Sequence, residues 1–337
     1  MWYNIIMKDK FIIGIDAGGS KVAYGLFDGA GVLVGRMQHA TDASADGMAF
    51  SDAIAQNVRA MLEKGGLTFE QLSGVGIGMP SFLLHEQGHV YITSSMPGIK
   101  DFPMRSYLQE RLPVRITLDN DANAAALAEY RRGAGRGSRH MVYVVIGTGL
   151  GSGIIIDGKP FHGTYGWAGE CGHMLAGIEN GLMCGCENSG CFMSLTSGKH
   201  LPARARMGLD SGIGSALNPD SVDGHALKEA CISEDPLAVE LIGQMARYLA
   251  ICVFNIYQML NINTFVFGGG LTGLGDMLFD RVRAEFDRYN HIPLPVHFKM
   301  AELGEDIGII GAAELLRSAD RKWSVVSGQN GDVHNPL

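Results

Sequence analysis

The sequence predicts a two-lobed α/β protein with a cleft between its lobes. Two segments, residues 13–35 and 144–163, share one plan: a strand, a glycine-rich turn, a second strand, an Asp-Gly pair and a third strand. This internal similarity indicates a duplicated unit, and it predicts two phosphate-binding turns that face one central cleft. A chain of 337 residues, of which 46% are apolar, is long enough to build a core in each lobe.

The first lobe begins with a short apolar run, residues 11–16, that ends in an acid. Residues 21–27 and 31–37 are β-compatible, and the Asp28-Gly29 pair between them is a strong hairpin signal. The pattern then predicts a helix over 46–64, strands over 74–79 and 114–118, a helix over 122–132, and an irregular binding loop over 81–103.

The second lobe repeats this alternation. Its predicted strands are residues 141–146, 153–156, 159–161, 263–267 and 296–300, and its predicted helices are 236–260 and 276–289. The segment 236–260 is the most apolar, but Glu240 and Arg247 within it indicate a buried amphipathic helix rather than a membrane span. A last helix over 307–316 crosses back to the first lobe, and residues 209–224 are polar and glycine-rich.

Composition argues against several classes of partner. The net charge of −8 and the isoelectric point near 5.7 argue against nucleic acid, whose binding needs Lys and Arg to neutralise phosphates. Six cysteines fit a reducing cytoplasm better than a disulfide framework. Residues 1–10 carry too short an apolar run for a signal peptide. We therefore expect a cytoplasmic protein with neither a nucleic-acid nor a membrane partner.

One histidine and three cysteines gather in a glycine-rich stretch. His173 precedes Cys184 by eleven residues, and Cys186 and Cys191 complete a Cys-x-Cys pair with a third cysteine five residues further on. A Cys₃His set closes a zinc tetrahedron without an open position, so the predicted zinc is structural and the chemistry is expected nearby. The alternative is a cluster of buried thiols beside a core histidine.

These elements predict the domain boundaries. Residues 1–121 with 304–317 form a small N-terminal lobe, and residues 122–303 form a large C-terminal lobe that holds the zinc loop. Residues 318–337 are polar and without an apolar period, which predicts a loose tail.

Three glycine clusters directly follow strands. They are Gly18-Gly19, residues 147–151 and residues 268–270. Glycine lets backbone N–H groups face a phosphate at close range, and three such clusters at strand ends indicate one nucleotide in a cleft. The sequence has no GxxxxGK[ST] motif, which excludes a P-loop. A strand rather than a helix follows the turn at Gly147, which argues against NAD.

Two acids carry the predicted chemistry. Asp16 ends the first strand beside the first glycine turn, where a carboxylate suits Mg²⁺ next to phosphates, and Lys21 adds a positive charge there. Asp121 follows another strand end and suits a general base that takes a proton from a substrate hydroxyl. The alternative role of Asp121 is a helix cap, which Asp119 or Asn120 fills equally well.

Five motifs together resemble the ROK (repressor, ORF, kinase) family. They are DAGGSK at 16–21, NDANA at 120–124, GTGLG at 147–151, GECGH at 169–173 and the cysteine motif at 184–191, and the match runs in order from residue 11 to residue 316. The resemblance implies an actin-like ATPase fold of the ribonuclease H-like type. It also implies ATP with Mg²⁺, transfer of the γ-phosphoryl group to a sugar hydroxyl, usually the 6-hydroxyl, and a homodimer or homotetramer.

The resemblance assigns a role to each motif. Asp121 is the base, Asn120 and Glu170 bind the sugar, and His173 serves zinc through one ring nitrogen and the sugar through the other. The implied nucleotide positions are Asp16, Gly18, Gly19, Lys21, Gly147, Thr148 and Gly149 around the phosphates and magnesium, with Gly269 and Gly270 under the nucleoside.

Three positions depart from the family's sugar pocket. Met193 stands where the family has Glu, Ser81 follows Pro80 where the family has Gly, and Ser95 replaces an Asn ahead of a Pro-Gly. A thioether lacks the acceptors of a carboxylate, so glucose is less secure as the substrate, and other hexoses or N-acyl hexosamines are equally plausible. A catalytically silent sugar sensor is the alternative function. A DNA-binding repressor is disfavoured because the chain is acidic and only ten residues precede the first strand.

Overall fold

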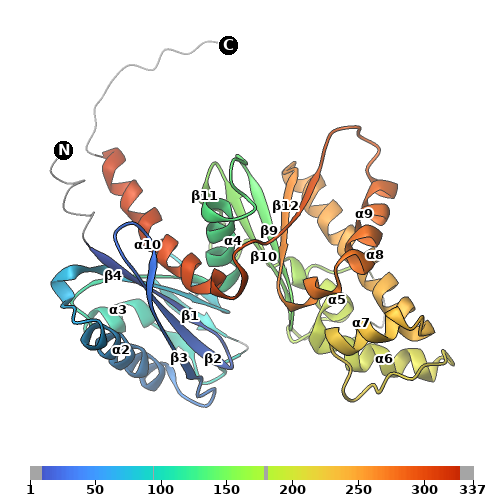
Figure 1. Ribbon diagram of the computed structural model, residues 1–337, viewed down its shortest axis with the longest axis horizontal. Helices are drawn as coiled ribbons and strands as arrows, with labels where there is room; N and C mark the ends of the chain where they lie inside the picture. The colour runs from blue at the N-terminus through green and yellow to red at the C-terminus, as the bar shows by residue number, and fades with distance from the viewer. Residues whose placement is uncertain (1–9, 94, 178–180, 327–337) are drawn as a thin grey trace, which may run out of the picture. The chain divides into compact units, whose positions relative to one another are not determined.

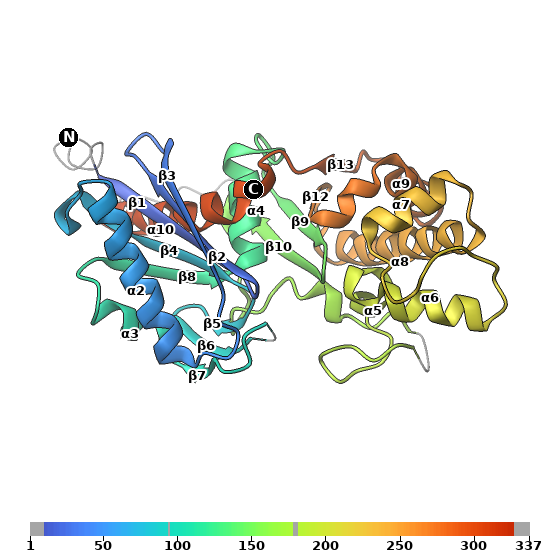
Figure 2. The same ribbon diagram turned by 60° about the horizontal axis from the view of Figure 1, so that its bottom comes forward.

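The computed structural model describes residues 10–93, 95–177 and 181–326, with backbone alone for residues 319–326. The chain divides into two compact units, Met1–Ala124 with Asp306–Leu337 and Ala125–Glu305. Each unit contains a five-stranded sheet, and Figures 1 and 2 show the elements of both units from two directions. The helix α4 (Asp121–Arg132) and the short 3₁₀ helix η6 (Gly304–Asp306) contain the two points of division.

The sheet of the first unit has the order β3-β2-β1-β4-β8. Its strands are β1 (Phe11–Ala17), β2 (Lys21–Phe27), β3 (Leu33–Ala40), β4 (Leu72–Met79) and β8 (Arg115–Asn120). β2 is antiparallel to β1 and β3, whereas β4 is parallel to β1 and β8. The sequence predicts all five strands, but β3 begins two residues later than expected because Gly31 turns the chain with a φ of +86°.

Helices cover both faces of this sheet (Figure 1). On one face lie α2 (Gly47–Lys64) and α3 (Met104–Gln109), and on the other lies α10 (Ile307–Val326); the 3₁₀ helix η2 (Phe69–Gln71) leads from α2 into β4. Strand side chains alternate between faces, so Ile13 and Ile15 join the core under α2 while Ile12 joins the core under α10. Asp46 begins α2, because its carboxylate accepts the Ala49 N–H at 2.8 Å.

Two glycines let α10 lie directly on the sheet. A Cβ atom at Gly76 would be 1.8 Å from the carbonyl oxygen of Ala312, and one at Gly14 would be 2.0 Å from that of Ile309. Both neighbours are backbone atoms of the helix, so a side chain at either glycine requires the whole helix to move.

We expect Gly76→Ala to lower the free energy of unfolding by about 3 kcal/mol, because the added methyl group forces α10 off the sheet. Urea denaturation followed by circular dichroism measures this change. Gly35→Ala on β3 is the matched control, because its Cβ would meet Leu26 Cβ at an ordinary 3.4 Å. The control is expected to stay within about 1 kcal/mol of the wild type. Equal stability of the two variants would contradict the close packing of α10.

The segment that the sequence predicts as an irregular loop, residues 81–103, contains a small sheet. Its strands are β5 (Phe82–Leu84), β6 (His89–Ile92) and β7 (Lys100–Phe102), in the order β5-β6-β7. The strands are three or four residues long, too short for a visible apolar period, and the intervening polar residues obscure them. Leu83 and Val90 are fully buried and join the core of the first unit.

The sheet of the second unit repeats the first in pattern. Its order is β11-β10-β9-β12-β13, with the strands β9 (Met141–Ile146), β10 (Leu150–Ile156), β11 (Lys159–Pro160), β12 (Thr264–Gly268) and β13 (His297–Met300). The first two pairs are antiparallel and the last two parallel, as in the first unit. Asp157 and Gly158, with φ of +49° and +75°, make the hairpin turn that the sequence predicts. The shared topology supports the predicted duplication.

The second unit is mostly helical outside its sheet. Its helices are α5 (Phe192–Thr196), α6 (Leu201–Asp210), α7 (Gly224–Ile232), α8 (Pro236–Leu260) and α9 (Asp276–Tyr289), and its 3₁₀ helices are η3 (Cys171–His173), η4 (Gly198–His200) and η5 (Gly270–Leu274). Among the described residues, α8 is the one helix long and apolar enough to cross a membrane. Buried side chains such as Leu241, Met245 and Val253 place it in the core of this unit.

The last helix is longer than predicted. α10 continues to Val326, whereas the sequence predicts its end at residue 316 and a loose tail from residue 318. Residues 312–326 contain neither Gly nor Pro, so no local signal stops the helix where its apolar period ends. Residues 327–337 of the predicted tail lie outside the described residues.

Candidate active site

The predicted residues of the first unit lie at the carboxyl ends of three parallel strands. In the ladder, Asp16 of β1 is opposite Gly78 of β4, and Gly78 is opposite Asp119 of β8. Met79 is opposite Asn120 in the same way. Because neighbouring parallel strands end at one edge of a sheet, the DAGGSK and NDANA motifs come together at this edge.

The first glycine turn joins β1 to β2. The Gly18 N–H donates to the Lys21 carbonyl at 2.9 Å, and the Gly18 carbonyl accepts the Thr41 hydroxyl at 2.7 Å. Asp16 is half-buried at the start of this turn; burial raises its pKa, and the positive charge of Lys21 opposes that shift. Gly308 of α10 faces this carboxyl group, since a Cβ there would lie 2.4 Å from Asp16 Oδ2.

Asn120 and Asp121 form the junction between β8 and α4. Asn120 Oδ1 accepts the Ala122 N–H at 2.8 Å, and Asp121 Oδ1 accepts the same N–H at 2.9 Å. Burial raises the pKa of Asp121 to about 6, and the negative charge of Asp16 adds to the effect. The carboxyl group of Asp16 is therefore close enough to Asp121 to influence its protonation. A carboxylate with a pKa near 6 is a stronger base than an ordinary Asp and is still ionised at neutral pH.

Ser81 and Ser95 border this junction and the first glycine turn. Asn120 Nδ2 donates to the Ser81 carbonyl at 3.3 Å, while the Ser81 hydroxyl donates to the Met79 carbonyl at 3.3 Å. Ser95 lies against the glycine turn, because a Cβ at Gly19 would be 2.6 Å from Ser95 Cβ. Ser81 and Ser95, which depart from the family pattern, therefore lie beside Asn120 and Gly19, which the family resemblance assigns to the sugar and the phosphates.

Asp119 is a buried residue that organises the junction, a role that its sequence context alone does not predict. Its side chain is 1% exposed, and Oδ1 accepts the Asn120 N–H at 2.8 Å and Asn123 Nδ2 at 3.0 Å. His85 Nδ1 lies 3.5 Å from Asp119 Oδ2. The Asp-Asn-Asp run is a signal for Asp119, whereas no local signal points to His85, which lies between β5 and β6.

The second glycine turn, between β9 and β10, is held by residues far along the chain. The carbonyl of Gly147 accepts the Gly198 N–H at 2.8 Å, and that of Thr148 accepts the Lys199 N–H at 3.2 Å. Within the turn, the Gly147 N–H donates to the Gly149 carbonyl at 2.9 Å. The third cluster follows β12, where Gly269 has a φ of +92° and Gly270 begins η5.

Glu170 directly precedes the 3₁₀ helix η3, and His173 is its last residue. His173 Nε2 lies 4.0 Å from Glu170 Oε2, whereas His173 Nδ1 lies 3.5 Å from Cys184 Sγ. The two ring nitrogens therefore face two different groups: a carboxylate that suits sugar hydroxyls, and the cysteine cluster. Desolvation lowers the pKa of His173, which favours the neutral imidazole that a metal requires.

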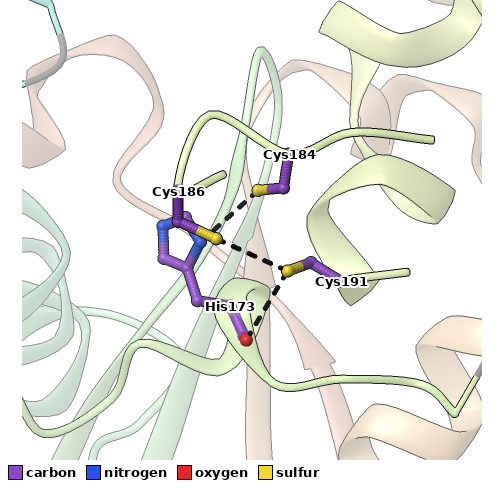
Figure 3. A group of neighbouring side chains, drawn as sticks. All are labelled: His173, Cys184, Cys186 and Cys191. Carbon is purple, nitrogen blue, oxygen red and sulfur yellow. Dashed lines mark hydrogen bonds between the residues drawn. The ribbon is translucent and has the colours of Figure 1, made fainter. Parts of the chain in front are cut away.

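The cysteine cluster has the geometry of a metal centre (Figure 3). Ligand atoms of His173, Cys184, Cys186 and Cys191 all lie within 4.8 Å of one another, and the Cys186 and Cys191 sulfur atoms are 3.6 Å apart. Burial and the neighbouring thiols raise the pKa of Cys191 to about 12. A bound cation would reverse that shift, because it stabilises thiolates. The donor set fits a metal that prefers thiolate and imidazole.

Comparison with known proteins identifies the family. A model of the ROK family matches residues 12–319. The chain belongs to the ROK family. It is 30% identical to a glucokinase of Halalkalibacterium halodurans, over 93% of this chain and 97% of that protein. It is 32% identical to a glucokinase of Streptomyces coelicolor, over 91% and 98%.

Solved structures of ROK proteins agree with this assignment. A ROK family glucokinase from Streptomyces griseus, solved in complex with glucose and AMPPNP, is 30% identical, with a TM-score of 0.74 over 91% of this chain and 99% of that chain. The predicted actin-like ATPase fold is thereby confirmed. The ROK protein described here is a sugar kinase, a phosphotransferase with an alcohol group as acceptor.

Proposed function

We propose that this sugar kinase acts in the cytoplasm and transfers the γ-phosphoryl group of ATP to a hydroxyl of a hexose or an N-acyl hexosamine. The family resemblance favours the 6-hydroxyl as the acceptor. The observation that carries the proposal is the Asp121 carboxyl group, half-buried at the junction of β8 and α4 with its pKa raised to about 6. The glucokinase relatives, and the Streptomyces griseus structure with glucose and AMPPNP, support a hexose and ATP as substrates.

The reaction follows from these residues. The Asp121 carboxylate takes the proton of the sugar hydroxyl as that oxygen bonds to the γ-phosphorus. The bond from the γ-phosphorus to the bridging oxygen breaks, and ADP leaves with that oxygen. Asn120, Glu170 and His173 hold the sugar hydroxyls, and Ser81, Ser95 and Met193 shape the pocket around them.

The proposed nucleotide positions belong to three glycine clusters. Gly18 and Gly19 form the first turn, with Asp16 at the end of β1 and Lys21 at the start of β2 beside it. Gly147, Thr148 and Gly149 form the second turn. Gly269 and Gly270 are assigned to the nucleoside. The carboxylate of Asp16 suits contact with the water shell of Mg²⁺. When bound, Mg²⁺ would neutralise charge on the phosphates.

The cluster of His173 and three cysteines suits zinc in a structural role. Cys184, Cys186 and Cys191 with one imidazole complete a tetrahedron, so no position is left for a catalytic water. The role of this centre is to fix the ring of His173 next to Glu170. Assembly as a homodimer or homotetramer stays a prediction from the family resemblance.

A coupled ATPase assay across sugars tests the proposal. The panel holds glucose, mannose, fructose, allose, N-acetylglucosamine and N-acetylmannosamine with Mg-ATP, and Asp121→Asn is the control. We expect turnover on at least one sugar and its loss in the control. A folded wild type that binds a panel sugar by calorimetry without turnover would instead establish the silent sensor, and it would overturn the kinase mechanism.

A further inference from the structure

The helix α5 begins directly after the last cysteine of the metal cluster. Met193 is its second residue, and its side chain reaches two segments that are far apart in the sequence. Its sulfur atom accepts the Leu150 N–H at 3.0 Å. Cβ atoms at Gly149 and Gly172 would lie 3.3 Å from its sulfur and 3.0 Å from its terminal methyl group. The thioether thus lies between the second glycine turn and η3.

The Leu150 N–H is available to this sulfur because of the hairpin register. Leu150 is opposite Ile146, and the hydrogen bond that closes the hairpin belongs to the adjacent pair, Gly147 and Gly149. In an antiparallel pair, hydrogen-bonded and non-hydrogen-bonded residues alternate, so the Leu150 N–H points away from β9. Leu150 is 2% exposed, so without the sulfur this N–H would be a buried donor without an acceptor.

The same segment of chain holds the other side of the turn. Gly198 and Lys199, which follow α5, donate their N–H groups to the carbonyls of Gly147 and Thr148. Within the part of the chain that the structure describes, the N–H groups of Thr148 and Gly149 donate no hydrogen bond. Successive backbone N–H groups in a turn form a concave site that binds anions. Residues 193–199 therefore fix the turn such that two amides stay available for a phosphate.

We propose that Met193 is a positioning residue for the phosphate, acting through its hydrogen bond with Leu150 rather than as a direct contact with the sugar. The inference rests on the proposed function, in which the turn at residues 147–149 binds phosphates. A thioether of this length both fills the space beside Gly149 and Gly172 and supplies an acceptor. The side chain thereby also links the phosphate turn to η3, which carries His173.

Two variants separate the acceptor from the packing. Met193→Leu keeps a similar volume and removes the acceptor, whereas Met193→Gln keeps the length and supplies an amide oxygen. We expect Met193→Leu to weaken Mg-AMPPNP binding about fivefold. This is the low end of the cost of an unsatisfied buried donor, because the thioether that is lost is a weak acceptor. Met193→Gln is expected to bind Mg-AMPPNP within about twofold of the wild type.

Adenosine binding distinguishes a loss of phosphate binding from a general loosening of the fold. It lacks phosphates, so its dissociation constant is expected to be equal in the wild type and in both variants, as measured by isothermal titration calorimetry. Leu195→Ala, a truncation on the same helix α5, is the matched control and is expected to leave the ratio of the two dissociation constants unchanged.

Each alternative outcome has a separate meaning. Unchanged Mg-AMPPNP binding in Met193→Leu would overturn the inference while the kinase assignment stands. Parallel loss of adenosine and Mg-AMPPNP binding, or no rescue by Met193→Gln, would reduce Met193 to packing. A folded wild type that binds no Mg-AMPPNP would overturn the assignment of the turn, and with it this inference.

Discussion

Replacement of Asp121 by Asn is expected to lower kcat by about 10²–10⁴-fold, the usual contribution of a general base. The amide keeps the size of the side chain, so the dissociation constant of the sugar, measured by calorimetry, is expected to change little. Asp280→Asn on the exposed side of α9 is the matched control and is expected to retain wild-type turnover. A variant that keeps more than about a tenth of wild-type turnover would contradict the assignment of the base.

The pH profile provides a second readout of the same group. Burial, and then the charge of Asp16, raises the pKa of Asp121 to about 6, so the carboxylate is protonated below that pH and cannot take a proton. We expect kcat to be constant above pH 7 and to fall roughly tenfold per pH unit below about 6. This acidic limb should vanish from the residual activity of Asp121→Asn. An acidic limb of the same midpoint in the variant would assign it to another group.

Removal of the metal from the cysteine cluster is expected to weaken sugar binding strongly. Chelation, or Cys184→Ser, frees the ring of His173, so fewer molecules hold His173 and Glu170 in the geometry that binds sugar. If fewer than a tenth of the molecules keep that geometry, the apparent affinity for sugar falls at least about tenfold. The affinity for Mg-AMPPNP is expected to fall less, because none of the four residues of the cluster belongs to the phosphate turn.

Metal content and calorimetry measure this effect. Wild-type protein is expected to carry one zinc per chain, and Cys184→Ser markedly less. Cys231→Ser is the control, because Cys231 lies on α7 outside the cluster. Equal losses of sugar and nucleotide affinity would show that the metal supports the whole unit rather than His173.

The order of elements and the motif residues follow from the sequence, because their signals are local. The Asp157-Gly158 pair specifies a hairpin, and cysteines spaced two and five residues apart specify the candidate metal ligands. The strand pattern places Asp16 and Asn120 each at the end of a strand, whereas the order β1-β4-β8 that brings these ends to one edge is seen only in the structure. The roles of these residues in catalysis stay predictions that the experiments above test.

Contacts between distant segments are determined only by the tertiary structure. Met193 bonds with Leu150, 43 positions away, and Asp119 lies beside His85 because β5 and β6 fold over the end of the sheet. The three short strands at 82–102 form because they bury Leu83 and Val90, although their own pattern is too brief to predict them. Local spacing determined which residues are assigned the chemistry. Long-range packing decided which neighbours hold them, because the partner of a side chain across the fold leaves no periodic pattern in the sequence.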